Sequence, residues 1–386
     1  MKLVLVGNYP PDGQESMERF TRMLAEGFAG EGLEAAIWRP VPVFGRLAKS
    51  TTTGFGKWLG YVDKWLLFPL ILRWRTWREG TAPPRFHICD HSNAPYLAHL
   101  PRSESAITCH DVLAIQGAMG DKAACCPASR TGRVLQEWIL RNLLRARNLA
   151  AVSETTRQSL EELGRGRMKE DAGRNWRVIL NGFNADFQPM GRAAAKGLLQ
   201  SAGLDPERPF LLHVGSGLPR KNRLMLVEIL KQLSDEPELM ACFAGQPLRG
   251  DELSRIREYR LEGRIVEVAK PGHETLVALY SSCRAFVFPS FSEGFGWPVI
   301  EAQACGAPVI ASNRPPVPEV SGGAAMLADP RDPAAFASAC RKIARDAARR
   351  ELVDMGLLNI RRFDTRKSIR AYLELHGIRR NGEEID

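Results

Sequence analysis

The sequence predicts an α/β protein built from two doubly wound halves. Short apolar runs alternate with segments of helical periodicity along the 386 residues, which is the pattern of strands joined by helices. Several of the runs are almost continuously apolar, as strands are in a parallel sheet that helices cover on both faces. The pattern resets near residues 182–200, and a chain of this length suits two domains.

The first half opens with a strand and a helix. Lys2–Gly7 is read as a buried strand that ends in a Pro-Pro-Asp-Gly turn, and Glu15–Gly30 then has helical spacing of its apolar residues. Leu135–Arg147 is expected to form a long amphipathic helix. We expect the other strands of this half at Glu34–Arg39, Phe86–Asp90, Ala106–His110, Asn148–Val152 and Arg177–Leu180.

The second half repeats the alternation of strand and helix. Ala334–Gly356 is a helical stretch rich in Ala and Arg, and Thr365–His376 is expected to form the final helix. Strands are expected at Phe210–Val214, Met240–Gly245, Arg264–Val268, Ala285–Pro289 and Pro308–Ser312, with helices between them.

The net charge and the cysteine spacing indicate which kinds of partner and metal site to expect. The 53 Lys and Arg against 44 Asp and Glu give a net charge of +9, which suits a polyphosphate ligand, an anionic membrane or nucleic acid. The chain has no nucleic-acid module signature, so we expect no nucleic-acid partner. The eight cysteines show no C-x-x-C spacing, which predicts a reducing, cytoplasmic environment and no structural zinc. The longest apolar run, Trp65–Leu72, is far shorter than the ~20 residues that span a bilayer.

The segment Phe286–Ser312 is the most informative part of the chain. It reads as strand, Gly-rich loop, helix and strand in fewer than thirty residues, with Pro298 suited to the first helical turn. The backbone amides of Phe295, Gly296 and Trp297 would then point out of a helix N-terminus, which favours an anion such as phosphate.

Two glutamates flank this loop. Glu293 lies in the loop and Glu301 about one turn into the helix, so both can face the same cleft. Carboxylates would repel phosphate, so we expect them to accept hydrogen bonds from hydroxyl groups such as those of sugars. The alternative is a helix cap with an exposed glutamate.

In a second glycine-containing segment, Leu211–Asn222, a strand is followed by glycines and then by Arg220, Lys221 and Asn222, which are expected to open an exposed helix. The G-x-G of this segment is not a dinucleotide fingerprint, because Arg220 occupies the third glycine position. Arg220 and Lys221 instead place positive charge at the mouth of the sheet, where ligands of open α/β folds bind. The alternative is a solvated basic turn.

Two further segments are weaker candidates. In Ile107–Leu113 a strand runs straight into His110, which would lie at an active-site edge or serve as a hydrogen-bonded structural histidine. The loop Asn8–Glu18 follows the first strand and carries Gly13 near the start of a helix. This loop either contacts a ligand or only turns the chain.

Together these segments resemble the retaining glycosyltransferases of family 4. The resemblance covers nearly the whole chain, and its most specific motif is the E-x7-E pair of Glu293 and Glu301. The family often has two adjacent glycines in the N-terminal loop, where this chain has Gly13 and Gln14. The stretches that carry the resemblance are ITCHDVL, AVSETTRQSL (151–160), VILNGFNADF (178–187), HVGSGLPRKN (213–222), FPSFSEGFGWPVIEAQACGAPVIAS and PPVPEV (315–320).

The resemblance implies the GT-B fold, with two Rossmann-like domains facing each other across a cleft. Residues 1–187 would form the acceptor-side domain, joined by a C-terminal helix at 363–386, and residues 188–362 would bind the nucleotide-sugar donor.

The resemblance also implies a role for each candidate residue. Glu301 would hold the ribose hydroxyls of the nucleotide, and Glu293 would bind hydroxyls of the transferred sugar. Arg220 and Lys221 would neutralise the diphosphate leaving group, while His110 would contact the donor sugar. The remaining donor-binding candidates are Gly13, Gly215 and the amides of Phe295, Gly296 and Trp297.

The implied function is transfer of a hexose-type sugar from a nucleoside-diphosphate sugar to the hydroxyl of a glycan or lipid-linked acceptor. The chain has no D-x-D triplet, and we expect a reaction that needs neither metal nor cofactor. The alternatives with the same fold are a nucleotide-sugar epimerase and a non-catalytic nucleotide-sugar binding protein.

The segment Lys57–Arg78 holds four of the eight tryptophans, with five basic residues against the single acid Asp63. This composition suits peripheral, reversible contact with an anionic cytoplasmic leaflet. Packing or an acceptor cleft is the favoured alternative, because Pro69 is expected to interrupt any single helix here. The spacing of Trp58, Tyr61 and Trp65 also suits a stripe that faces the core.

Overall fold

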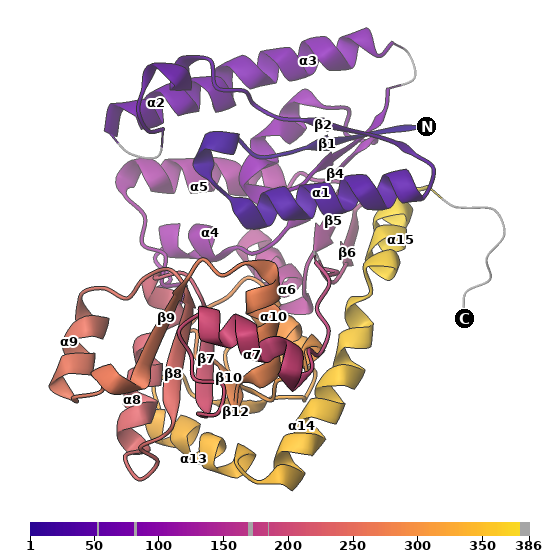
Figure 1. Ribbon diagram of the computed structural model, residues 1–386. Coiled ribbons are helices and arrows are strands. Elements are labelled where there is room, and N and C mark those ends of the chain that lie inside the picture. Colours follow the sequence, from indigo (N-terminus) through magenta and orange to yellow (C-terminus); the bar gives the residue numbers. More distant parts are fainter. Residues whose placement is uncertain (52–53, 81–82, 169–172, 184, 379–386) are drawn as a thin grey trace. The chain divides into compact units, whose positions relative to one another are not determined.

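The computed structural model describes residues 1–51, 54–80, 83–168, 173–183 and 185–378, and these form two compact units (Figure 1). The described residues of the first unit fall within 1–119, 128–184 and 364–386, and those of the second within 120–127 and 185–363. Each unit is built on a parallel six-stranded sheet. The prediction of two doubly wound α/β halves is therefore confirmed.

The sheet of the first unit has the strand order β2-β1-β3-β4-β5-β6. All neighbouring strands run parallel, and the order reverses between β1 and β3, as in doubly wound folds. The strands are β1 (Lys2–Val6), β2 (Glu34–Trp38), β3 (Arg85–Ile88), β4 (Ser105–Cys109), β5 (Asn148–Ala151) and β6 (Asn175–Val178).

Helices cover both faces of this sheet because its strands are apolar on both sides. Val4 and Val6 pack with helices α3 and α5, whereas Leu3 and Leu5 pack with α1 and the C-terminal helix α15. Helix α15 lies beside α1, where Gly27 leaves room for Ile369. The helices of this unit are α1 (Glu15–Gly30), α2 (Gly54–Val62), α3 (Phe68–Arg78), α4 (Leu113–Ala118), α5 (Arg130–Leu143), α6 (Glu154–Gly164) and α15 (Thr365–Leu375).

The sheet of the second unit has the order β12-β11-β10-β7-β8-β9, and its strand order reverses between β7 and β10. This is the strand order of the dinucleotide-binding α/β fold. The strands are β7 (Phe210–Gly215), β8 (Met240–Gly245), β9 (Ile265–Ala269), β10 (Ala285–Phe288), β11 (Val309–Ser312) and β12 (Met326–Ala328).

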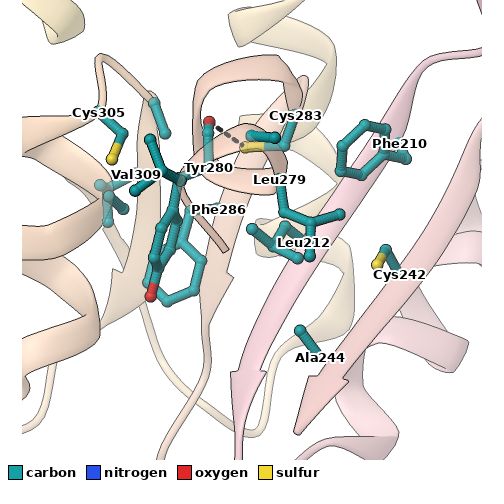
Figure 2. Close-up of a cluster of buried hydrophobic side chains, with 14 of the residues drawn as sticks. Phe210, Leu212, Cys242, Ala244, Leu279, Tyr280, Cys283, Phe286, Cys305 and Val309 are labelled. Carbon is teal, nitrogen blue, oxygen red and sulfur yellow. Dashed lines mark hydrogen bonds between the residues drawn. The ribbon is translucent and has the colours of Figure 1, made fainter. Parts of the chain in front are cut away.

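Two apolar layers sandwich the second sheet. One face packs Phe210 and Leu212 against α7, α10 and α11, and Figure 2 shows part of this cluster around Tyr280 and Phe286. The other face packs Leu211 against α8, α9 and α13. The helices are α7 (Arg192–Ser201), α8 (Leu224–Gln232), α9 (Asp251–Glu258), α10 (His273–Ser282), α11 (Trp297–Ala304), α12 (Val317–Ser321), α13 (Pro333–Ile343) and α14 (Asp346–Asn359).

The structure corrects three details of these elements. The expected helical stretch 334–356 is two helices, α13 and α14, which Ala344 and Arg345 separate. Helix α5 starts five residues earlier than expected, because the Ser129 side chain accepts a hydrogen bond from the Gly132 amide and caps its N-terminus. The short edge strand β12 was not expected at all.

The expectation that Pro69 interrupts a single helix is wrong. Residues 54–78 are continuously helical, and a π-helical turn at Asp63–Leu67 precedes the proline. The Phe68 amide donates to the Asp63 carbonyl, which frees the Lys64 carbonyl to accept a hydrogen bond from the Tyr96 hydroxyl (3.0 Å). The wider turn absorbs the proline, which has no amide hydrogen to donate.

The first domain was expected to include residues 120–127, but these residues cluster with the second unit. The Ser292 hydroxyl donates a hydrogen bond to the Ala124 carbonyl (2.9 Å), which holds residues 120–127 beside the loop that follows β10. No helix among the described residues is both long and apolar enough to cross a bilayer.

Candidate functional site

The candidate site of the second unit lies where β7 and β10 end. These neighbouring strands flank the point at which the strand order reverses, which is where ligands of open parallel sheets bind. Two hydrogen bonds join the loops that follow the strands. The Phe291 amide donates to the Arg220 carbonyl (2.8 Å), and the Asn222 side chain donates to the Pro289 carbonyl (3.0 Å).

Glu293 is bound by both predicted phosphate-binding cations. Lys221 Nζ lies 2.7 Å from Glu293 Oε1 and 2.9 Å from Oε2, and Arg220 Nη1 lies 2.8 Å from Oε2. Arg220 Nη1 also donates to the Ser292 carbonyl (3.0 Å). The structure thus brings Glu293 into contact with two residues that precede it in the chain, Lys221 by 72 positions and Arg220 by 73.

The Glu293 carboxylate is charged although it is buried, with 5% of its side chain exposed. Burial alone would raise its pKa, but the positive charges of Lys221 and Arg220 outweigh burial and lower the pKa below the usual range. Two cations and one carboxylate leave one net positive charge at the end of the sheet. This charge favours an anionic ligand.

The basic turn differs in form from the expectation. Arg220 and Lys221 do not open an exposed helix: they lie in a 3-10 turn, Pro219–Lys221, and α8 begins only at Leu224. Their side chains are 21% and 12% exposed. Asn222 ends the turn in the left-handed region (φ 51°), which asparagine tolerates better than most residues.

Asn222 is a positioning residue that the sequence analysis missed. Its side-chain amide donates to the carbonyls of Pro289 (3.0 Å) and Pro330 (2.7 Å), which follow β10 and β12. These bonds tie the basic turn to two other strand ends. The sequence signal was an asparagine directly after an Arg-Lys pair at the end of a turn.

The loop before α11 has the expected form. Helix α11 starts at Trp297 with Pro298 in its first turn, and Gly296 caps it in the left-handed region (φ 104°). The Phe295 side chain is buried against the ring of Phe363, with a centroid distance of 5.9 Å. Packing of this ring fixes the loop whose amides are the predicted anion donors.

Glu301 stands on α11 with a partner of its own. The Tyr280 hydroxyl, from α10, donates a hydrogen bond to Glu301 Oε2 (3.0 Å). Burial, and then the Glu301 charge, raise the pKa of Tyr280 well above its usual value, so the hydroxyl remains a donor. Sequence reasoning missed Tyr280, because an aromatic residue at helical spacing is typical of a core position.

His213 is fully buried in β7 next to this cluster. Its Nδ1 hydrogen bonds to the Val287 carbonyl (3.2 Å), so Nδ1 carries the proton and Nε2 the lone pair. Nε2 has no hydrogen-bond partner among the described residues. Burial lowers the pKa of His213 to about 4, so the ring is neutral at pH 7. A Cβ at Gly215 would lie 3.4 Å from this Nε2 and 3.9 Å from Lys221 Cδ.

Two predicted site residues, His110 and Gly13, lie in the first unit. His110 directly follows β4 and is buried, and its Nε2–H donates to the Cys89 carbonyl (2.9 Å). Burial lowers the pKa of His110, so the ring is neutral. Gly13 adopts φ 63° between a 3-10 turn and α1, a conformation that favours glycine. A pocket of about 80 Å³, lined in part by Asn8, Gln14 and Arg39, lies beside this loop.

Comparison with known proteins places these features in context. Residues 198–355, most of the second unit, match the family model described as glycosyl transferases group 1. A stretch of 198 residues is 33% identical to O-antigen chain mannosyltransferase B of Escherichia coli and covers 49% of this chain and 52% of that protein. A stretch of 134 residues is 31% identical to O-antigen chain mannosyltransferase RfbU of Salmonella typhimurium and covers 35% of this chain and 38% of that protein. The matched part thus spans about half the length of these relatives at most.

Solved structures show the same fold over almost the whole chain. Sucrose-phosphate synthase from Thermosynechococcus elongatus superposes with a TM-score of 0.70 at 22% identity, covering 98% of both chains. Anabaena HepE, solved in complex with UDP and glucose, superposes with a TM-score of 0.69 at 18% identity, covering 97% of this chain and 98% of that one. The chain therefore has the GT-B fold of these proteins.

Proposed function

We propose that this chain is a retaining glycosyltransferase of family 4 that moves a hexose-type sugar from a nucleoside-diphosphate sugar to an acceptor hydroxyl. The observation that carries the proposal is the convergence of Arg220, Lys221 and Glu293 at the switch point of the second sheet. The match to the group 1 glycosyl transferase model covers the same residues.

The two cations would bind the donor diphosphate and stabilise the charge that develops on it as the sugar departs. Glu293 neutralises part of their charge through the two ion pairs of this structure. When the donor binds, the diphosphate would replace Glu293 as the partner of Arg220 and Lys221. The Glu293 carboxylate would then accept hydrogen bonds from hydroxyls of the sugar. The amides of Phe295, Gly296 and Trp297 would orient sugar and phosphate.

Glu301 would accept hydrogen bonds from the ribose hydroxyls of the nucleotide. Tyr280 supports this role, because its hydroxyl holds one oxygen of Glu301 in place. A carboxylate with one fixed oxygen is suited to a pair of neighbouring hydroxyls.

The proposed transfer proceeds on one face of the sugar. The bond from the anomeric carbon to the diphosphate oxygen breaks, and the acceptor oxygen forms its bond to that carbon on the same side. The acceptor proton passes to the departing diphosphate. Front-side attack of this kind retains the anomeric configuration without a protein nucleophile, and we propose that it needs no metal.

The acceptor is proposed to be a glycan or a lipid-linked sugar, with peripheral contact to the cytoplasmic leaflet of the membrane. The names of the O-antigen mannosyltransferases support a hexose donor and a glycan acceptor.

Thermal-shift screening against UDP-, GDP- and ADP-hexoses tests donor binding, since a ligand at a hundredfold excess over its Kd stabilises a protein by about 2.7 kcal/mol. Release of nucleoside diphosphate, and the anomeric configuration of the product, then separate a retaining transferase from an epimerase or a binding protein. An active protein should keep its rate in EDTA. A stabilising donor that is never cleaved would contradict the proposal.

A further inference from the structure

Exposed apolar side chains are concentrated in one short part of the first unit. Among the described residues, 21 large hydrophobic side chains are exposed, and ten of them lie between residues 39 and 78. Scattered exposed apolar residues are normal, but a concentration of this kind marks an interaction surface. The ten residues are Val41, Val43, Phe44, Leu47, Phe55, Trp58, Leu66, Leu70, Trp74 and Trp77.

The helical part of this surface turns an apolar face outward. Leu66, Leu70, Trp74 and Trp77 recur at intervals of four, four and three residues and are 62%, 59%, 52% and 78% exposed. Such spacing places them on one side of a helix. Phe68 and Leu72 are buried in the core, so the helix is apolar on both its inner and outer sides. Packing in the core of the unit therefore explains the apolar residues on the inner side of the helix but not those on its outer side.

The forty residues from 39 to 78 account for most of the protein's net positive charge. They contain eight Lys and Arg and one acid, Asp63, which makes +7 of the net +9 of the whole chain. Asp63 is 1% exposed, so it contributes no surface carboxylate. Of the eight cations, Arg39 and Lys64 pair with carboxylates elsewhere in the described structure. The other six are Arg46, Lys49, Lys57, Arg73, Arg75 and Arg78.

The buried Asp63 also joins the two parts of this surface. Its carboxylate accepts hydrogen bonds from the amides of Val43 (3.1 Å), Phe44 (3.0 Å) and Gly45 (2.9 Å) and from the Tyr9 hydroxyl (2.8 Å). The 3-10 turn after β2 is thereby fastened to the π-helical turn of the helix. The two segments that carry the exposed apolar residues are thus held together.

We infer that the described residues 39–51 and 54–78 form a peripheral membrane-binding surface for bilayers that contain anionic lipids. Tryptophan rings suit the headgroup level of a bilayer, and these six cations would meet anionic headgroups. Arg78 lies over the ring of Trp74 (4.8 Å) and Arg75 over that of Trp38 (5.3 Å), so apolar and basic groups are interleaved. This charge pattern favours a lipid surface over a protein partner, whose interface would have to match an excess of positive charge along two segments.

The surface also bears on the proposed function. Lys64, within the helix, pairs with Asp12 (2.9 Å) in the loop after β1. The surface is therefore attached to loops at the carboxyl ends of β1 and β2, the edge at which ligands of such sheets bind. If the proposed glycosyl transfer is correct, a docked protein would hold this edge near the membrane, which favours a lipid-linked acceptor.

Co-sedimentation of the full chain with vesicles tests the inference. We expect binding to vesicles of phosphatidylcholine with phosphatidylglycerol, and at least about tenfold weaker binding to phosphatidylcholine alone. Binding should weaken strongly at about 1 M salt, where the Debye length falls to about 3 Å. Protein that stays in the supernatant with anionic vesicles at low salt would overturn the inference.

Matched variants locate the surface. Arg73→Gln/Arg75→Gln/Arg78→Gln, and separately Trp74→Ser/Trp77→Ser, should each lower the vesicle partition coefficient by about tenfold or more. The control Arg345→Gln/Arg350→Gln/Arg361→Gln removes the same charge from exposed positions of the second unit and should leave more of the binding. An equal loss in the control would contradict the inference.

Two further readouts separate this inference from the proposed transfer. Circular dichroism shows whether each variant is folded, and nucleoside diphosphate binding should be unchanged in all of them. Vesicle binding without nucleotide binding would support the membrane-binding surface and contradict the proposed glycosyl transfer. Nucleotide binding without vesicle binding would support the proposed transfer and contradict the membrane-binding surface.

Discussion

Lys221 Nζ lies 2.7 Å from the buried Glu293 Oε1, so a residue expected to bind a diphosphate is paired with a carboxylate of its own chain. Arg220 binds the same carboxylate at 2.8 Å. Glu293 would therefore compete with a bound diphosphate for both cations.

Glu293→Gln should tighten the binding of free nucleoside diphosphate by about threefold to tenfold while it abolishes sugar transfer. The amide keeps the shape of the side chain but no longer neutralises Arg220 and Lys221, so their full charge is available to the ligand. Calorimetric titration measures the change. The exposed Glu262→Gln is the matched control, and weaker binding in Glu293→Gln would contradict the competition.

Arg220→Ala and Lys221→Ala should each lower kcat/KM by about tenfold to a thousandfold, since each removes a charged donor to a developing anion. Each should also destabilise the fold by about 1–3 kcal/mol, because a buried carboxylate loses a partner. Combining either change with Glu293→Gln should restore much of that stability but none of the activity. Normal kinetics in a folded Arg220→Ala protein would exclude this residue from the site, with Arg249→Ala as the exposed control.

Tyr280→Phe should weaken nucleoside diphosphate binding by about threefold to tenfold, the effect of one hydrogen bond. Glu301→Ala should weaken it further, because it removes the carboxylate that Tyr280 only positions. The pair should be non-additive, so that Tyr280→Phe has little effect once Glu301 is Ala. Additive losses in a double-mutant cycle would show that Tyr280 acts independently of Glu301.

His376→Gln should flatten the pH dependence of stability between about pH 6.5 and pH 5. His376 Nε2 lies 3.1 Å from His87 Nδ1 inside the first unit, and burial lowers the pKa of His376 to about 3. In this range the unfolded chain binds a proton that the folded protein excludes, so stability falls as the pH falls. Urea midpoints at both pH values measure the slope, and an unchanged slope in a folded His376→Gln protein would contradict this account of His376.

Local patterns predicted most of the fold. Helix α1 and strand β8 begin and end at the expected residues, because each is a periodic or continuously apolar segment bounded by turn residues. Strand β12 has three residues, too few to show a pattern. The π-helical turn before Pro69 depends on Tyr96, whose hydroxyl satisfies the carbonyl that the turn frees. No local rule could predict such a partner.

The candidate site likewise has features that the local sequence predicts and features that depend on long-range contacts. The loop around Gly296 and the spacing of Glu293 and Glu301 are local features, and the sequence analysis found them. The ion pairs of Glu293 join positions 72 and 73 residues apart, so only the pairing of β7 with β10 brings them together. Asn222 and Tyr280 acquire their roles from the same long-range packing.

The most direct test of the proposed transfer is the rate at which nucleoside diphosphate is released from hexose donors in the presence of membrane-derived acceptors. The wild-type protein should release it from at least one of the UDP-, GDP- and ADP-hexoses. The double variant Arg220→Ala/Lys221→Ala should be slower by about a hundredfold or more, and Arg249→Ala should match the wild type. Equal rates in wild type and double variant, or a wild type that neither binds nor cleaves any donor, would contradict the account.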